Sequence, residues 1–123
     1  MSVIHGKIDV LYSALAELQN EIEIWNESNF PGKKPHQPLL GVGEEMGELV
    51  AAYGRLCHAH LKMEQNIRAA TQYDKEDAVG DMVIYLIDYC NQNNIDFANA
   101  ITKTWDQVRQ RDWKKFPKNG RSE

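Results

Sequence analysis

Two short acidic segments carry the residue types best suited to bind a hard cation. The first, Gly43–Glu48, contains three glutamates and two glycines, and the second, Asp77–Asp81, has an aspartate at each end. If both segments are helical, carboxylates three or four residues apart lie on one helix face. Two such helices side by side would surround one ion with carboxylate oxygens, the ligands that suit Mg²⁺. The sequence therefore predicts a magnesium site between two helices.

A helical wheel separates the three glutamates of the first segment. Glu44 and Glu48 lie on the polar face, whereas Glu45 lies about 100° from Glu44, at the border of the apolar face. A carboxylate at that border is partly desolvated, so it should be neutralised, paired or bound to a cation. Glu45 and Glu48 are therefore the strongest candidate ligands.

Each acidic segment also contains a glycine inside its expected helix. Gly47 and Gly80 each adjoin a carboxylate, and each costs roughly 1 kcal/mol of helix stability relative to alanine. Since a merely solvated face does not need glycine, we expect these positions to allow close helix approach or to leave room for a ligand. Like charges one turn apart also repel each other by a few tenths of a kcal/mol per pair, unless a cation neutralises them.

Apolar residues recur at helical spacing in four segments. We expect helices over residues 4–26, from 39 to about 65, from an Asp74 cap to residue 93, and from an Asp96 cap onward. Three prolines and a glycine between residues 29 and 38 exclude a regular element there. No segment shows the two-residue alternation of a half-buried strand, so the predicted fold class is all-α.

The 123 residues are the size of one ordinary domain. We assign residues 1–117 to a single helical domain and 118–123 to a flexible basic tail. On the third expected helix, Ile84 and Tyr85 lie on the same side as the acids, which indicates contact on that side. We therefore predict a four-helix bundle completed by oligomerisation, as a homodimer or a homotetramer.

Charge and hydropathy restrict the class of partner. The formal net charge is −4, which argues against stable nucleic-acid binding. The stretch 109–121 is the exception, with six basic residues and one acid. No stretch approaches the length of an apolar membrane span, and no secretory signal is recognisable at residues 1–7, so we expect a cytoplasmic protein without membrane contact.

In this order the segments resemble those of the MazG-like all-α nucleoside triphosphate pyrophosphohydrolases. The resemblance rests on Gly43–Leu49, Asp77–Asp81 and the later stretch Thr104–Trp113, and it covers roughly residues 20–117. It implies hydrolysis of a nucleoside triphosphate, NTP or dNTP, to the monophosphate and pyrophosphate, with water attacking the α-phosphorus. It also implies a role in removing canonical or aberrant nucleotides from the pool.

The resemblance also assigns roles to the acids. Glu45 and Glu48 match the family's ligand pair for Mg²⁺ or Mn²⁺, Asp81 matches its terminal aspartate, and Glu44 matches an additional acid that binds the ion or orients water. Many members carry glutamate three residues before that aspartate, where this chain has Ala78. We place Asp77, one turn before Asp81, as the fourth ligand.

Other residues are candidates for substrate contact. The resemblance implies that an aromatic or polar residue of the first helix lies near the base, so Trp25 and Asn29 are base-pocket candidates, and it implies a lysine on the last helix, which Lys103 matches. The cationic candidates could bind the triphosphate, but each candidate also fits an ordinary surface or core position. The candidates are Lys62, Lys103, Arg111, Trp113, Trp25 and Asn29.

A different class of function fits part of the same pattern. The acids could be a solvated face of a non-catalytic helical interaction module whose basic tail binds a partner. A carboxylate-bridged di-iron bundle would call for Glu-x-x-His pairs, and the sequence contains none. The enzyme and the interaction module are therefore the two functions that the residues support.

Overall fold

The computed structural model describes residues 7–57 and 72–122 of the chain. Four helices account for most of this part: α1 (Ile8–Asn29), α2 (Gln37–Cys57), α3 (Gln72–Gln92) and α4 (Phe97–Val108). The described residues contain no strand. The predicted all-α class is therefore confirmed.

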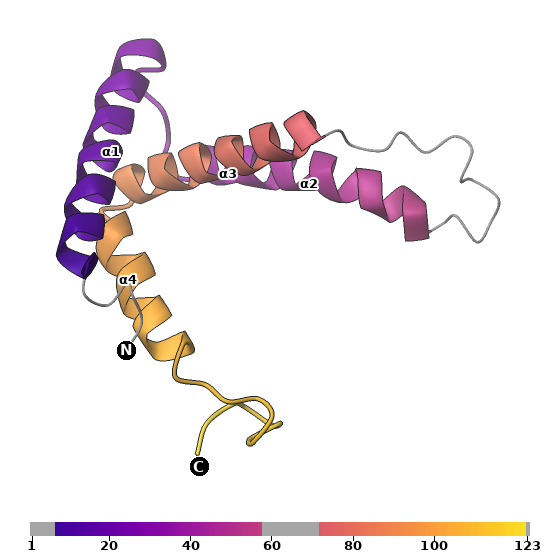
Figure 1. Cartoon of the computed structure of the whole chain (residues 1–123). Helices are drawn as coiled ribbons and strands as arrows, with labels where there is room; N and C mark the ends of the chain where they lie inside the picture. Colours follow the sequence, from indigo (N-terminus) through magenta and orange to yellow (C-terminus); the bar gives the residue numbers. More distant parts are fainter. Residues whose placement is uncertain (1–6, 58–71, 123) are drawn as a thin grey trace.

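Two helix pairs make up the architecture. Helices α2 and α3 run side by side in opposite directions, and α1 lies across one end of this pair (Figure 1). Helix α4 packs beside the N-terminal half of α1. The α2–α3 pair thus extends away from α1 and α4, and it is α1 that joins the two parts through its contacts with both α3 and α4.

The loop between α1 and α2 is shorter than the sequence predicted. Helix α1 continues to Asn29, and the Phe30 amide still donates to the Asn26 carbonyl at 2.7 Å. Helix α2 begins at Gln37 instead of residue 39. The side-chain oxygen of Gln37 accepts a hydrogen bond from the Lys34 amide at 2.8 Å. The expectation that Pro38 lies in the loop was wrong, because a proline in the first helical turn needs no amide donor.

The ends of α3 and α4 test two predicted caps. Asp74 is not the cap of α3, because this helix already begins at Gln72; an acid in the first turn still suits the helix dipole. Asn94, with a φ of 56°, stops the chain in the left-handed region after α3. Asp96 is the predicted cap of α4, since its carboxylate accepts from the Asn99 amide at 3.0 Å.

The junction of α1, α3 and α4 contains the apolar core of the described chain. Gln19 on α1 holds the start of α4 in place: its amide nitrogen donates to the Ile95 carbonyl at 2.8 Å, and its oxygen accepts from the Phe97 amide at 2.9 Å. The Tyr12 hydroxyl also donates to Asp96. The buried apolar side chains are Ile22, Ile87, Cys90 and Ala98.

After α4 the chain turns back on itself. The Asp112 amide donates to the Gly120 carbonyl at 2.8 Å, and the Gly120 amide donates to the Phe116 carbonyl at 2.7 Å. Gly120 has a φ of 71°, and a Cβ there would come within 2.9 Å of Arg111 Cβ. The predicted tail, residues 118–123, therefore begins inside a hydrogen-bonded turn.

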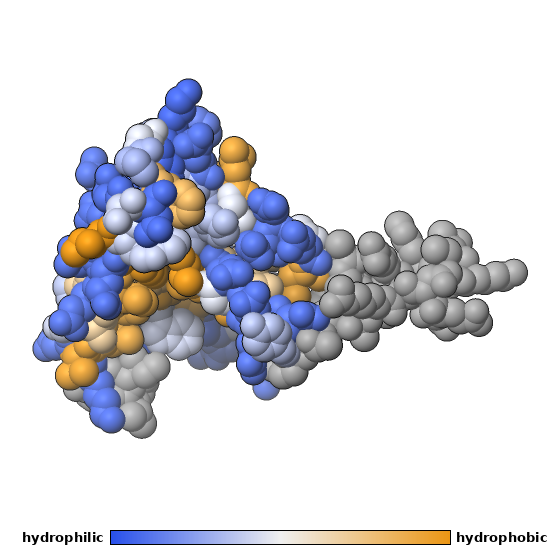
Figure 2. All heavy atoms as spheres, turned by 90° about the horizontal axis from the view of Figure 1, so that it is seen from above, coloured by the Kyte–Doolittle hydropathy of each residue, from blue (hydrophilic) through white to orange (hydrophobic). Residues whose placement is uncertain are grey.

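Large apolar side chains are exposed on all four helices, among them Val10, Leu40, Val79 and Trp105. Figure 2 shows hydrophobic residues reaching the surface between hydrophilic ones on the face that it views. Within the described residues, no helix combines the length and the apolar character needed to cross a membrane.

Candidate active site

A cleft of about 670 Å³ lies between the C-terminal end of α1, the loop that follows it, the first half of α2 and the middle of α3. The acidic residues Glu45 and Asp81 line one part of it, and Asn26, Lys33 and Asp88 line another. Apolar and aromatic side chains complete its walls. A concave site with few polar groups among apolar walls is the usual form of a small-molecule site.

Antiparallel packing of α2 and α3 brings the two predicted acidic segments to the same region. Glu45 is half-buried, as the helical wheel predicted, while Glu44 and Glu48 are exposed. On α3, Asp81 is half-buried and Asp77 is exposed. The half-buried acid of each helix therefore lines the cleft, whereas the three exposed acids are not among its lining residues.

The pKa of Glu45 reflects the negative charges around it. Burial raises the pKa of Glu45 above its usual value, and repulsion from Glu48, Asp81, Glu44 and Asp77 raises it further. Acids on both helices therefore act on Glu45, and we call these five residues the acidic cluster. Such a cluster favours a bound cation, which would lower the repulsion.

The donor set of this cluster fits Mg²⁺, because that ion prefers carboxylate and water oxygens. Among the described residues, however, no three or more histidine, cysteine, aspartate or glutamate side chains converge closely enough to hold a metal ion. The carboxylates thus have the oxygen ligands that Mg²⁺ prefers, but in this structure they do not converge on one point. The assignment of Glu45, Glu48, Asp77 and Asp81 as metal ligands stays a prediction.

The two glycines beside the acids do not have the first of the roles that we expected. A Cβ at Gly47 or Gly80 would meet no described heavy atom within 4 Å, apart from its own helix backbone and chain neighbours. Neither glycine therefore mediates close helix approach. The close approach occurs at Gly41, where a Cβ would come within 2.5 Å of the Tyr85 ring. The sequence interpretation overlooked Gly41, although it is one of three glycines, at positions 41, 43 and 47, in the first half of α2.

The Tyr85 contact changes the interpretation of the acidic side of α3. We expected Ile84 and Tyr85 to contact a second subunit, but both line the cleft, and Tyr85 packs on Gly41 of the same chain. These two residues therefore do not by themselves require a partner subunit.

Trp25 and Asn29, the two base-pocket candidates, differ in position. Trp25 lines the cleft, and its ring packs edge to face against Phe30, with centroids 5.7 Å apart. Asn29 does not line the cleft, and its side-chain amide donates to the Trp25 carbonyl at 2.8 Å. The aromatic candidate is thus placed to contact a ligand, and the amide candidate caps its own helix.

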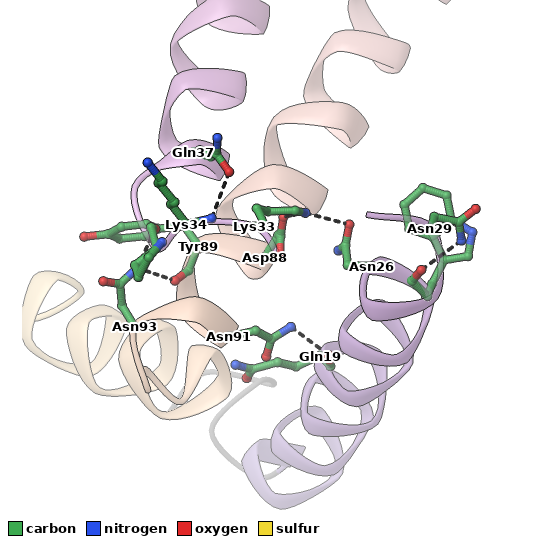
Figure 3. A network of polar contacts seen from close by, with 12 residues as sticks. Gln19, Asn26, Asn29, Lys33, Lys34, Gln37, Asp88, Tyr89, Asn91 and Asn93 are labelled. Atoms are coloured by element: carbon green, nitrogen blue, oxygen red, sulfur yellow. Dashed lines mark hydrogen bonds and ion pairs between the residues drawn. The ribbon is translucent and has the colours of Figure 1, made fainter. Parts of the chain in front are cut away.

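A buried polar group that the sequence interpretation missed lies in the same cleft. The Lys33 ammonium forms an ion pair with the Asp88 carboxylate and donates to Asn26 Oδ1 at 3.0 Å (Figure 3). The loop is also held by Asn93, whose amide donates to the Pro35 carbonyl at 3.0 Å. Asp88 continues the acidic face of α3 after Asp77 and Asp81, at a helical spacing of four and seven residues, and that spacing was the available signal.

The other candidates for substrate contact, apart from Lys62, lie elsewhere in the described chain. Lys103 is exposed on α4, and Arg111 and Trp113 pack on Gly120 in the C-terminal turn. None of the three lines the cleft within one chain. Lys62 falls outside the described residues.

The cleft therefore joins a cluster of carboxylates to an aromatic and amide-lined end. Carboxylate oxygens are ligands that suit a divalent cation, and aromatic rings are surfaces that suit a planar group. Comparison of the chain with protein-family models, with curated proteins and with solved structures gives no match, so the MazG-like resemblance stays a prediction from the motifs.

Proposed function

We propose that this chain is a Mg²⁺-dependent nucleoside triphosphate pyrophosphohydrolase that converts an NTP or dNTP and water to the monophosphate and pyrophosphate. The observation that carries the proposal is that Glu45 and Asp81, one from each acidic segment, line a cleft that also contains the exposed ring of Trp25. The acids suit a metal-bound triphosphate, and the ring suits a base. The order of the motifs supports the same activity.

The acids would divide the work of the reaction. Glu45, Glu48, Asp77 and Asp81 would hold Mg²⁺, which when bound supplies positive charge to the non-bridging oxygens of the triphosphate. Glu44, which is exposed and adjoins Glu45 in the chain, would orient a water molecule toward the α-phosphorus and accept its proton. The new bond joins the water oxygen to the α-phosphorus. The bond from that phosphorus to the bridging oxygen breaks, and pyrophosphate leaves.

Oligomerisation is part of the proposal. Large apolar side chains are exposed on every helix, and the buried apolar core of the described residues is small. A second copy of the chain, in a homodimer or homotetramer, would cover part of this surface. It could also bring Lys103 or Arg111 to the cleft of its partner, where these side chains would contact phosphate oxygens.

The test is pyrophosphate release from a panel of ribo- and deoxyribonucleoside triphosphates, with Mg²⁺ or Mn²⁺. We expect turnover of at least one nucleotide. Glu48→Gln and Asp81→Asn should each lower kcat/KM by about 100-fold or more, since replacing even a residue that only orients a metal ligand costs about 10–100-fold. Glu23→Gln and Asp9→Asn, exposed on α1, are the matched controls and should keep full activity. Full activity in either site variant would refute the assignment of metal ligands.

A non-catalytic helical interaction module is the second candidate function. It is favoured by the exposure of Glu44, Glu48 and Asp77 and by the lack of a converged metal-binding group among the described residues. In that case the acids would be a solvated face, and the basic segment after α4 would bind the partner. Folded protein that releases no pyrophosphate from any nucleotide with either ion would support this candidate against the enzyme.

A further inference from the structure

The end of the cleft away from the acidic cluster holds two buried polar atoms without a partner. Asn26 is 5% exposed and Asp88 is 2% exposed. Among the described residues, neither Asn26 Nδ2 nor Asp88 Oδ1 has a hydrogen-bond partner. Leaving such a group unsatisfied costs about 1–3 kcal/mol. Both residues line the cleft, so a molecule bound there would lie beside them.

Lys33 determines which atoms are left for a ligand. An ammonium group can only donate, so it takes the oxygen of the Asn26 amide and one oxygen of the Asp88 carboxylate. This fixes the orientation of the amide, which would otherwise be ambiguous. The remaining atoms are one donor, Asn26 Nδ2, and one acceptor, Asp88 Oδ1.

The surroundings of this donor and acceptor suit a flat ligand. Trp25 and Phe30 both line the cleft and are 54% and 56% exposed, so ring surface is available for stacking. Asp88 follows Asp81 by seven residues on α3, which corresponds to a rise of about 10 Å along the helix. A ligand that spans this length can touch the acidic cluster with one end and the amide and carboxylate with the other.

We propose that Asn26 and Asp88 recognise the edge of a nucleobase that presents an N–H donor beside an acceptor atom. The N–H would donate to Asp88 Oδ1, the acceptor would receive the Asn26 Nδ2 proton, and the base would stack on Trp25. The inference rests on the proposed function for the identity of the ligand as a nucleotide. It adds two residues that select the base, and it excludes bases whose edge N–H groups are blocked, because the buried Asp88 oxygen would then stay unpaired.

Free nucleosides test this inference without the triphosphate. Adenosine, guanosine, cytidine and uridine are titrated onto the full chain, and binding is followed by ligand-observed NMR. We expect at least one nucleoside to bind, and Asn26→Leu to weaken it roughly tenfold, the value of one buried hydrogen bond of about 1.4 kcal/mol. Asn20→Leu, exposed on the same helix, is the matched control and should bind as the unmodified chain does.

A second measurement needs no variant and so does not depend on whether Asn26→Leu folds. The nucleoside that binds best is compared with its analogue methylated on the edge N–H groups, using the unmodified protein. Loss of binding on methylation supports the inference, whereas equal binding of the two compounds, or no binding of any nucleoside, overturns it.

The outcomes for the two proposals are distinguishable. Methylation-sensitive nucleoside binding without pyrophosphate release supports base recognition and refutes the hydrolase. Hydrolysis that is equally fast for triphosphates of the normal and the methylated nucleoside supports the hydrolase and refutes base recognition by Asn26 and Asp88.

Discussion

Lys33, in the loop after α1, forms an ion pair with Asp88 on α3, 55 residues later in the chain. The two side chains are 15% and 3% exposed, so the pair is largely shielded from water. Through its second hydrogen bond, to Asn26, Lys33 joins α1, the loop and α3 at one point. This contact shapes the end of the cleft that we assign to base recognition.

Removing one member of this pair should destabilise the fold strongly. Lys33→Met leaves the buried Asp88 carboxylate without its cation, which typically costs about 3–5 kcal/mol. The double variant Lys33→Met/Asp88→Leu removes both charges and should recover about half of that loss or more, since an apolar pair can replace a buried ion pair. Urea unfolding of both variants measures the free energies of unfolding.

Lys34→Met is the matched control for that cycle. Lys34 is the next residue and is exposed, so its replacement should change the free energy of unfolding by less than about 0.5 kcal/mol. If Lys33→Met were as stable as Lys34→Met, the buried ion pair would not contribute to the fold.

Gly41 should be sensitive to a single added methyl group, because Cβ would lie 2.5–2.7 Å from three atoms of the Tyr85 ring. Gly43→Ala, where a Cβ meets nothing described within 4 Å, should stabilise α2 by about 1 kcal/mol through helix propensity. Gly41→Ala should be about 1–3 kcal/mol less stable than Gly43→Ala, which is the usual cost of overpacking. Thermal or urea unfolding of the two variants gives the difference.

Tyr85 provides the control for this comparison. In a Tyr85→Ala background the clash is gone, so Gly41→Ala and Gly43→Ala should have similar effects. A difference that persists without the ring would mean that the penalty at Gly41 has another origin.

The Tyr12–Asp96 hydrogen bond should make stability depend on pH at both extremes. The Tyr12 hydroxyl, followed by the Asn99 amide, lowers the pKa of Asp96, and the bond to Asp96 raises the pKa of Tyr12. A lowered folded pKa contributes stability above the unfolded value near 4, and this is lost as pH falls through the folded pKa. A raised tyrosine pKa contributes stability below the unfolded value near 10, and this is lost as pH rises through the folded pKa.

Tyr12→Phe should therefore lower the Tm at pH 7, because the hydroxyl donor to the α4 cap is lost. The difference in Tm between Tyr12→Phe and the unmodified chain should become smaller below about pH 4 and above about pH 10. Tyr73→Phe, exposed at the start of α3, is the control and should show no such dependence. A gap that is constant from pH 3 to 11 would contradict the assigned bond.

Glu45 should be unfavourable for stability when no cation is present. Burial raises its pKa, and repulsion from Glu48 on the same helix and from Asp81 on α3 raises it further, so the folded chain binds this proton more tightly than the unfolded chain. The ionised carboxylate thus costs stability at pH 7, and stability rises as pH falls through the folded pKa. Glu45→Gln without Mg²⁺ should raise the Tm by roughly 1–3 °C, from a few tenths of a kcal/mol per relieved pair.

With Mg²⁺ present, Glu45 should contribute to stability instead of lowering it. Millimolar Mg²⁺ should raise the Tm of the unmodified chain by ligand linkage, and it should raise that of Glu45→Gln less. NaCl at equal ionic strength separates binding from screening of the charges. Equal shifts from both salts in both proteins would contradict a magnesium site at Glu45.

The sequence alone was sufficient to predict the four helices and the helix face on which the acids lie. Helix geometry repeats every 3.6 residues, so the apolar spacing alone predicts the four helices, and a wheel places Glu45 at the border of the core. The Asp96 cap is equally local, because its partner is the amide three residues later. The predicted starts of α2 and α3 were wrong by two or three residues, because competing local signals lie there, at Pro38 and Asp74.

Only the tertiary structure determined which of these residues meet. The pairing of Lys33 with Asp88, the packing of Tyr85 on Gly41, and the separation of Lys103 from the cleft depend on how whole helices dock. Docking is the sum of many weak apolar and polar contacts between segments far apart in the chain, and no local spacing encodes it. The sequence therefore predicted the helix faces of the acids in the candidate site, and the fold supplied the cleft and its buried amide and carboxylate.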